Sequence, residues 1–435
     1  MTHRSADHLR RLDVEGLARV EGEGSLHVEI SGDQVTEVEL EIFEPPRLFE
    51  ALLVGRRYDE APDITARVCG ICPVAYQMSA CAAMENAFGT VVPEHVREWR
   101  RLLYCGEWIQ SHALHINLLH APDFLGYADA VEMAEHDRSL LDRALRLKRT
   151  GNLVMETLGG RSIHPVTVRV GGFYRAPDPE AVQAMTGPLR RAIDDALDTV
   201  QWVAGFEFPE FESDYLFVAL RAGDRYPLEG GRVVSSSGLD TDPAGFAAMV
   251  EEDQVRRSTA LQARLGGTET YLTGPLARYA LNRQALPELS RQAADGAGLG
   301  AVCRNPFRSI VVRAVELVFA CEEALRLVER YEPLDPAAAS VTVGAGTGHG
   351  ATEAPRGLLL HRYVIAADGS IASARIVPPT SQNQLTIEDD LRRVVGQSLE
   401  LSDSELTQRC EQTVRNHDPC ISCAAHFLDV SVDRR

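Results

Sequence analysis

The chain has 435 residues, of which 45% are hydrophobic and 25% charged, and its formal net charge at pH 7 is −19. These values are typical of a globular protein with a large core, and the negative charge excludes nucleic acid and anionic membranes as main partners. No apolar run approaches the roughly 18 residues that cross a bilayer, and the polar N-terminus does not resemble a secretory signal. Nine cysteines, an odd number, do not fit a disulfide framework, so we expect a soluble, cytoplasmic protein.

The first structured segment is predicted at residues 17–43. Hydrophobic residues alternate with polar ones on both sides of Ser31–Asp33, a pattern typical of a β-hairpin. Before the hairpin, Arg19–Gly24 forms a glycine-rich turn that carries Glu21 and Glu23. Taken alone, this turn is best interpreted as a solvated loop.

A first cysteine pair, Cys69 and Cys72, precedes a segment at 74–88 that is predicted to be helical. Proline is favoured in the first turn of a helix, so Pro73 places Cys72 at the helix N-terminus. There the helix dipole and the nearby Arg67 would lower the thiol pKa and favour the metal-binding thiolate.

Four long helical patterns follow and together predict a central bundle. Their ranges are 93–121, 129–158, 178–205 and 305–331. The first of them contains His112, His115 and His120, which we interpret as core or surface histidines and not as ligands. The isolated cysteines are interpreted as small buried apolar residues.

The C-terminal third begins with Gly344–Gly350, a glycine-rich run. It lacks the lysine and hydroxyl that end a nucleotide-binding loop, so we reject it as a nucleotide site. Ala354–Gly357 is predicted to be a stiff turn that presents one arginine. A hairpin is predicted at 361–376, a rigid polar loop at 377–383, and an irregular connection earlier, at 224–246.

A second cysteine pair, Cys420 and Cys423, lies near the C-terminus. Two pairs with two intervening residues each make a four-thiolate site, which suits zinc, an iron–sulfur cluster or another soft transition metal. Because the pairs lie near opposite ends of the chain, the fold must bring these ends together. This spacing argues against a small zinc ribbon.

Several motifs along the chain occur in an order that matches one protein family. They are Arg19–Gly22, Arg67–Cys72, Gly159–Arg161 with His164–Pro165, Ala354–Gly357, Pro379–Thr380 with Asn383, and Asp418–His426. With these motifs the sequence resembles the large, catalytic subunit of a [NiFe]-hydrogenase, over nearly its whole length. The residues at 44–50 and 73–76 are closest in style to the cytoplasmic, bidirectional, NAD(P)-linked branch.

The resemblance implies a nickel held by four thiolates, two of which also bridge to an iron that carries carbon monoxide and cyanide. By position, Cys69 and Cys420 would be terminal on nickel, and Cys72 and Cys423 would bridge. The residues that match the family's pocket around the iron ligands are Pro355, Arg356, Pro379 and Thr380.

The resemblance also implies a route for protons. Hydrogen is a very weak acid, so its cleavage needs a metal and a base within bonding reach. Cys420 or Arg356 would accept the proton, and Glu21 matches the first relay carboxylate. Asp123 and Asp418 correspond to acids that pair with the pocket arginine.

Glu50 and His426 match a second metal site, usually magnesium, a hard cation that prefers oxygen ligands. Residues 427–435 match a C-terminal maturation peptide that is removed after nickel insertion. The alternative is that this tail is the native terminus. Two residues depart from the family pattern: Tyr76 and Glu23 each stand where a histidine is common, and Tyr76 can still donate a hydrogen bond to a thiolate.

We therefore predict an α+β fold, mainly helical, with a central bundle of long helices and peripheral β-hairpins, in one domain over residues 1–435. The expected activity is the reversible cleavage of H2 into protons and electrons. No cysteine cluster remains for iron–sulfur centres, so the implied partners are an iron–sulfur small subunit and flavin-containing, NAD(P)-reactive diaphorase subunits. A maturation endopeptidase and nickel-insertion proteins are also implied.

Three other interpretations stay open from the sequence. A non-catalytic four-cysteine zinc site would join the chain ends, but it leaves Glu21, Arg356 and Asp123 unexplained. The related subunit of respiratory NADH:quinone oxidoreductase shares the fold but lacks the cysteine pairs. A hydrogen-sensing regulatory hydrogenase would keep the same metal ligands.

Overall fold

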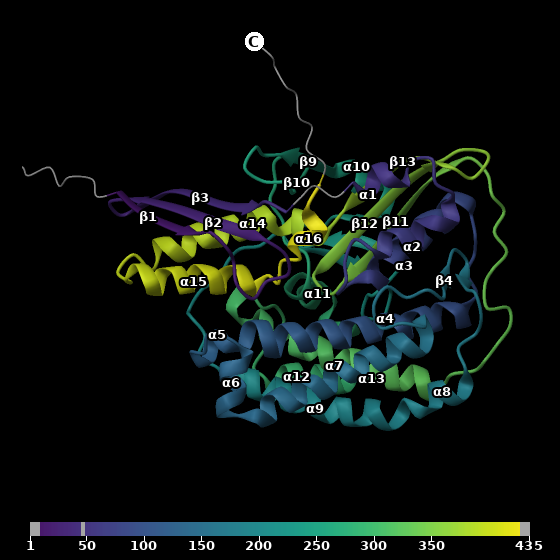
Figure 1. Cartoon of the computed structure of the whole chain (residues 1–435), viewed down its shortest axis with the longest axis horizontal. Coiled ribbons are helices and arrows are strands. Elements are labelled where there is room, and N and C mark those ends of the chain that lie inside the picture. Colours follow the sequence, from purple (N-terminus) through teal and green to yellow (C-terminus); the bar gives the residue numbers. More distant parts are fainter. Residues whose placement is uncertain (1–8, 45–47, 427–435) are drawn as a thin grey trace, which may run out of the picture.

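A layer of long helices forms one side of the molecule. The computed structural model describes residues 9–44 and 48–426. The long helices are α4 (Glu94–Leu114), α7 (Arg138–Gly159), α9 (Thr186–Ala204) and α13 (Ser309–Glu329). They lie next to one another in the lower half of Figure 1, and α4 packs against both α7 and α13. Apolar residues at helical spacing on α13, such as Val311, Val315 and Phe319, are almost completely buried, so the predicted bundle is confirmed.

Two of the predicted long helices are interrupted. The segment 129–158 forms α6 (Ala130–His136) and α7, because the side chain of Asp137 accepts a hydrogen bond from the Ser139 backbone N–H and starts a new helix. The segment 178–205 likewise divides into α8 (Pro179–Ala184) and α9. α4 continues through a π-helical turn, His115–His120, into α5 (Ala121–Leu125).

A three-stranded antiparallel sheet lies above the helices in Figure 1. Its strands are β11 (Gly346–Ala354), β12 (Gly357–Ile365) and β13 (Ile371–Val377). The helix α3 (Pro73–Phe88) packs directly on β11. A Cβ atom at Gly348 would lie 1.9 Å from the Ala83 carbonyl oxygen, and one at Gly350 would lie 2.3 Å from that of Ser79. The glycine-rich run therefore permits close packing of a helix on a strand, which agrees with its rejection as a nucleotide site.

The N-terminal sheet packs on the C-terminal helices. It consists of β1 (Leu9–Val14), β2 (Gly24–Ser31) and β3 (Gln34–Ile42), and it buries its apolar face against α14 (Pro379–Gly396) and α15 (Asp403–Asn416). The predicted hairpin is confirmed, and β1 adds a third strand. The prediction of a loop at 377–383 is wrong, because Pro379 occupies the first position of α14, where its missing N–H costs nothing.

The remaining elements are short. The helices are α1 (Phe49–Leu53), α2 (Ala61–Ala66), α10 (Pro243–Met249), α11 (Pro275–Asn282), α12 (Glu288–Gly296) and α16 (Ile421–Ala424). The strands are β4 (Val168–Arg169), β5 (Gly172–Phe173), β6 (Val218–Arg221), β7 (Arg232–Ser235), β8 (Asp240–Thr241), β9 (Val250–Gln254) and β10 (Leu261–Leu265). The irregular connection predicted at 224–246 thus contains β7, β8 and the start of α10.

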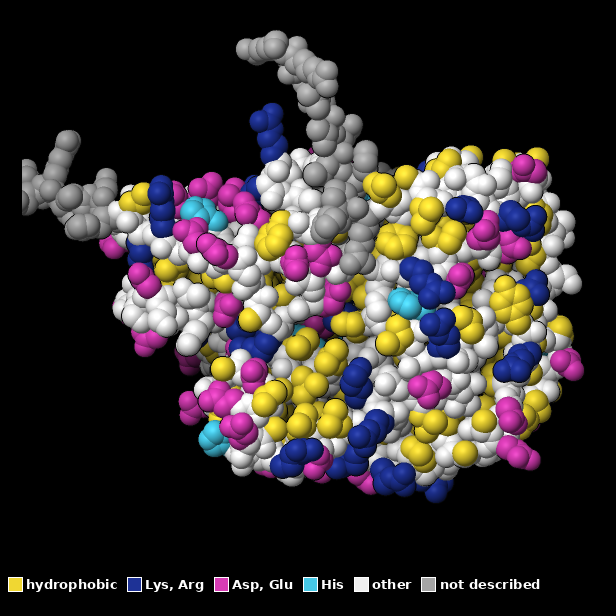
Figure 2. Space-filling model, viewed as in Figure 1, with side chains coloured by type: hydrophobic (Ala, Val, Ile, Leu, Met, Phe, Trp, Pro, Cys, Tyr) yellow, Lys and Arg dark blue, Asp and Glu magenta, His cyan; other side chains and the backbone are white. Residues whose placement is uncertain are grey.

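The side chains on the surface are of mixed type. The face in Figure 2 carries acidic, basic and hydrophobic side chains side by side, with no broad basic area. Within residues 9–44 and 48–426, no helix is both long and apolar enough to cross a membrane. The five isolated cysteines, at positions 81, 105, 303, 321 and 410, are all buried, as expected.

Candidate metal centre

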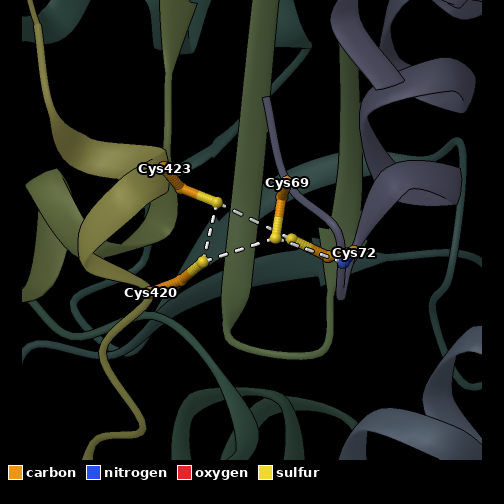
Figure 3. Close-up of side chains that lie close together, drawn as sticks. All are labelled: Cys69, Cys72, Cys420 and Cys423. Atoms are coloured by element: carbon orange, nitrogen blue, oxygen red, sulfur yellow. Dashed lines mark hydrogen bonds between the residues drawn. The ribbon is translucent and has the colours of Figure 1, made fainter. Parts of the chain in front are cut away.

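Four cysteine sulfurs meet where the two ends of the chain come together (Figure 3). The Sγ atoms of Cys69, Cys72, Cys420 and Cys423 all lie within 4.8 Å of one another, and all four residues are buried. The Sγ–Sγ distance is 3.5 Å between Cys69 and Cys420 and 3.8 Å between Cys72 and Cys423. A buried set of four soft donors fits a soft transition metal, and the prediction that the two pairs converge is confirmed.

The first cysteine loop is fixed by backbone hydrogen bonds. Cys72 is the N-cap residue of α3, as predicted, and its N–H and that of Ile71 both donate to the Cys69 Sγ at 3.3 Å. The side chain of Glu107 on α4 accepts hydrogen bonds from the next two N–H groups of α3. Gln110, one turn further along α4, donates to the Ile71 carbonyl. No motif in the sequence points to Glu107 or Gln110.

The second cysteine loop is held by the N-terminal turn. The Glu21 carboxylate lies 3.0 Å from the Cys420 Sγ and accepts a hydrogen bond from the Ser422 N–H at 3.1 Å. The Glu21 carbonyl accepts the Ile421 N–H. A Cβ atom at Gly22 would lie 2.7 Å from that of Ile421, so this approach requires glycine. The interpretation of this turn as a solvated loop is wrong. Thr380 adds a hydrogen bond from the Cys420 N–H to its hydroxyl.

Arg356 lies in the tight turn between β11 and β12 and is 2% exposed. Its guanidinium donates to Asp418 at 3.1 Å, and its Nε and Nη1 find no hydrogen-bond partner within residues 9–44 and 48–426. Burial opposes the charge, but Asp418 and the nearby cysteines raise the pKa of Arg356 well above its usual value. A permanent positive charge therefore faces the thiolates.

Two expected charge pairings are wrong. Asp123 forms ion pairs with Arg19 at 2.5 Å and with Arg415 at 2.7 Å, not with Arg356. Of the two predicted acids, only Asp418 reaches the pocket arginine. Arg67 pairs with Asp63 near the surface. The hydrogen bond with Cys420 lowers the pKa of the Cys72 thiol, but those with Cys423 and Cys69, together with burial, raise it overall, against the prediction.

The pKa values of the cysteine thiols are shifted in opposite directions. Hydrogen bonds from the other three cysteines, led by Cys420, hold the pKa of Cys69 well below its usual value, with a contribution from Arg356. Burial raises the pKa of Cys420. Metal binding at this site must therefore release protons, since the thiolate is the ligand.

Tyr76 is buried near Cys423, with its ring 5.6 Å from that of His361, and burial raises the pKa of its phenol.

A second cluster of potential ligands lies at the end of the described chain. The Glu50 carboxylate is 3.0 Å from the His426 Nε2. Glu252, which the sequence analysis missed, is held by Arg375 at 3.0 Å and keeps one buried carboxylate oxygen without a hydrogen-bond partner. Burial, with the negative charge of Glu50, raises the pKa of Glu252. Glu50 and His426 are thus two adjacent side chains that could ligate a hard divalent cation, whereas Glu252 does not form a close three-ligand group with them among the described residues.

Comparisons with known proteins decide the family. The family model for nickel-dependent hydrogenase matches residues 47–143 and 303–426, which include all four cysteines. The alpha subunit of sulfhydrogenase 1 from Pyrococcus furiosus is 31% identical over 422 residues, which cover 96% of this chain and 98% of that protein. The chain belongs to the nickel-dependent hydrogenase family. It is a large, catalytic subunit, an oxidoreductase whose cysteine cluster is the metal site.

Other relatives agree with this assignment of the hydrogenase subunit. The alpha subunit of sulfhydrogenase 2 from Pyrococcus furiosus is 32% identical over 430 residues, 96% of this chain and 99% of that protein. A solved structure, an NAD+-reducing [NiFe]-hydrogenase in the H2-reduced state, matches with a TM-score of 0.87 and 26% identity, covering 96% of this chain and 99% of the other. The predicted family and fold are thereby confirmed.

Proposed function

We propose that the four thiolates of this hydrogenase subunit hold nickel and iron, with Cys69 and Cys420 terminal on nickel and Cys72 and Cys423 bridging. The iron would carry carbon monoxide and cyanide. The convergence of four buried sulfurs supports this assignment, because soft thiolates bind nickel and iron well. When bound, the centre supplies the heterolytic cleavage of H2 and accepts its electrons.

The contact between Glu21 and Cys420 supports the proposed proton route and is the observation that carries it. At 3.0 Å the carboxylate is within hydrogen-bond reach of the sulfur. The Cys420 thiolate would accept a proton and pass it to Glu21. The Ser422 N–H, also bonded to Glu21, keeps the carboxylate oriented towards the loop.

Arg356 would stabilise negative charge above the thiolates. Its charge is held by Asp418, and its two unpartnered nitrogens leave N–H donors for small ligands in the pocket. Pro355 and Pro379 add apolar surface, and Thr380 fixes the backbone of Cys420. Asp123 does not bond Arg356 and would act on it indirectly. It bonds Arg415, which precedes His417 by two residues and Asp418 by three, so it helps to fix the segment that carries Asp418.

Glu50 and His426 would hold a magnesium or similar hard cation that fixes the C-terminal segment. Their contact of 3.0 Å supports this proposal. The backbone N–H of Ile376 donates to the other Glu50 oxygen, so the carboxylate is already oriented. The expected maturation peptide at 427–435 lies outside the described residues and stays a prediction, as do the endopeptidase and nickel-insertion partners.

Electrons would leave through an iron–sulfur small subunit. All cysteines outside the centre are isolated and buried, so they cannot hold a cluster. Gly70 is exposed between the two buried cysteines, which supports a short path from the centre to the surface. Ile163 and Val166 are exposed on either side of His164, which bonds the Ala66 carbonyl near this loop, and they would form part of the surface that binds the small subunit.

From the small subunit, electrons would reach NAD(P) through a flavin-containing module in the cytoplasm. The similarity to an NAD+-reducing [NiFe]-hydrogenase supports this assignment. It can be tested by purifying the native complex and identifying its subunits by mass, followed by assays of H2-dependent NAD(P) reduction. A complex without a flavin-containing subunit would contradict the proposal.

The metal assignment is tested by metal analysis with infrared spectroscopy on the protein from its native host. We expect equal amounts of nickel and iron, together with carbon monoxide and cyanide bands. Cys420→Ala should lose nickel and hydrogen turnover, because a terminal ligand is removed. Nickel retention in this variant would show that the ligand assignment is wrong, and zinc alone in the parent protein would exclude the nickel–iron centre.

A further inference from the structure

Arg356 has few side-chain contacts that could orient it. Among the described residues, its one hydrogen-bond partner is Asp418, and its buried Nε and Nη1 have none. A long side chain with one such contact depends on its backbone for its position. The backbone of Arg356 is a two-residue turn, since Ala354 on β11 pairs with Gly357 on β12. Whatever holds this turn therefore sets where the guanidinium lies.

Arg278, on the short helix α11, holds this turn through two of its backbone carbonyls. Its Nη1 donates to the Ala354 carbonyl and its Nη2 to the Pro355 carbonyl, each at 2.8 Å. The side chain is completely buried, and its guanidinium carbon lies 4.4 Å from the centre of the Trp108 ring. These bonds connect the guanidinium to the two residues immediately before Arg356.

Two carboxylates keep Arg278 in this orientation. Glu316 on α13 accepts from Nε and Nη2, each at 2.8 Å, and Glu353 on β11 accepts from Nη1 at 3.0 Å. The Arg278 guanidinium thus donates five hydrogen bonds, each to a different oxygen atom. Only the planar fork of arginine can make them all, because the ammonium group of lysine is a point charge with three donors.

The start of α11 contacts the turn independently. Gly274 has a φ of +105°, and a Cβ atom there would lie 2.6 Å from the Arg356 carbonyl oxygen. The Gly274 carbonyl accepts the Arg278 backbone N–H, so the two contacts belong to one rigid unit. The segment Gly274–Arg278 therefore contacts the backbone of the turn at three successive residues, Ala354, Pro355 and Arg356.

We propose that Arg278 is a positioning residue that sets the place of the Arg356 guanidinium over the metal centre. This inference rests on the proposed role of Arg356 in turnover. Arg278 acts through the backbone of the turn and does not itself touch the reacting atoms. Replacing it should move Arg356 even when the metals and the fold are retained.

The first test is amide hydrogen exchange of the peptide 351–360 in Arg278→Lys, measured in the metal-free chain. We expect exchange in the turn to become at least about tenfold faster, because two carbonyl bonds to the turn are lost. Arg100→Lys is the matched control, since Arg100 is also buried, bonds Glu85 through both Nη atoms, and lies away from the turn. Equal exchange in the two variants would overturn the proposal.

The second test compares turnover at matched nickel content. Arg278→Lys should lower kcat by about tenfold or more while KM for H2 changes little, as expected when a group is displaced by a fraction of an ångström. Arg100→Lys should stay near the parent kcat. If Arg278→Lys does not fold, Gly274→Ala tests the same unit, because its new methyl group pushes the Arg356 carbonyl.

The control Arg356→Lys separates this inference from the proposed function. If Arg356→Lys keeps full turnover, the role of Arg356 fails, although the exchange result still reports on the turn. If Arg356→Lys loses turnover and Arg278→Lys leaves both exchange and kcat unchanged, the positioning role of Arg278 fails by itself.

Discussion

At the scale of single residues, Glu21 contacts both the sulfur and the backbone of the second cysteine loop. The same carboxylate oxygen lies 3.0 Å from the Cys420 Sγ and 3.1 Å from the Ser422 nitrogen. A glutamine can keep the bond from the Ser422 N–H, but it cannot accept a proton at neutral pH. Substitution with glutamine therefore separates proton transfer from loop structure.

We predict that Glu21→Gln retains nickel and lowers the exchange of hydrogen isotopes with solvent by about 100-fold or more, the usual contribution of a positioned acid or base. Isotope exchange in H2/D2O mixtures measures this effect. Glu23→Gln is the control, since it removes one exposed carboxylate from the same turn. Equal exchange rates in Glu21→Gln and Glu23→Gln would mean that the proton leaves by another route.

A second residue-scale prediction concerns pH. Burial raises the pKa of Glu353 from 4.5 to about 7, although Arg278 opposes the shift. The folded protein therefore keeps this proton where the unfolded chain has lost it, so the stabilising effect is full below pH 4.5 and is lost as pH rises to 7. Over this range the parent should lose about 3 kcal/mol of unfolding free energy, and Glu353→Gln should not. Unfolding free energies of both proteins, measured from pH 5 to 8, test this difference. If the unfolding free energies of the variant and the parent changed with pH in the same way, the raised pKa of Glu353 would be contradicted.

At the scale of elements, the N-terminus of α3 carries the first cysteine loop. The first N–H groups of a helix have no partner within it, and here Glu107 accepts those of Val74 and Ala75. Because Glu107 comes from α4, this contact joins the helical layer to the metal site. Gln110 extends the same connection to the Ile71 carbonyl.

We predict that Glu107→Ala destabilises the fold by about 1–3 kcal/mol for each buried N–H left unpaired, and also weakens nickel retention. Ser402→Ala is the matched control, because Ser402 caps the exposed start of α15 and its loss costs about 1 kcal/mol. Unfolding curves and nickel analysis measure both effects. Full nickel retention in Glu107→Ala would show that the loop keeps its geometry without this cap.

At the scale of the whole molecule, the metal site joins both ends of the chain. The four cysteines belong to the same buried cluster as residues of α3, α4 and α13. Further C-terminal contacts run from His426 to the Thr259 carbonyl and from Ser422 to Glu44. We propose that the chain is one folding unit, because its single largest core spans most of its length.

A ligand that binds only the folded state stabilises it, by about 2.7 kcal/mol at a hundred times its Kd. We therefore predict a higher unfolding temperature for protein from nickel-supplied cells than for protein from nickel-starved cells. Calorimetry of the two preparations measures the difference. Cys420→Ala should show no difference between them, and the same unfolding temperature for both parent preparations would contradict the prediction.

The sequence by itself determined the long helices, the two hairpins and the two cysteine pairs. Hydrophobic spacing predicted the bundle and both hairpins, and Pro73 predicted the helix that begins after Cys72. The ordered motifs identified the cysteines and Arg356. These features are local, because a cap, a turn or an amphipathic stripe is encoded within a few neighbouring residues.

Only the tertiary structure decided which distant side chains meet. The partners of Asp123 are Arg19, in the turn between β1 and β2, and Arg415 on α15, both far from it in the chain. No local pattern distinguishes Arg278 from other charged residues, and only the packing of α11 brings it to the Arg356 turn. Glu252 likewise has no local signal for its place near Glu50. The physical reason is that a buried charge is satisfied by whichever donor or acceptor the packing of whole elements brings within about 3 Å, and no short-range pattern encodes that packing.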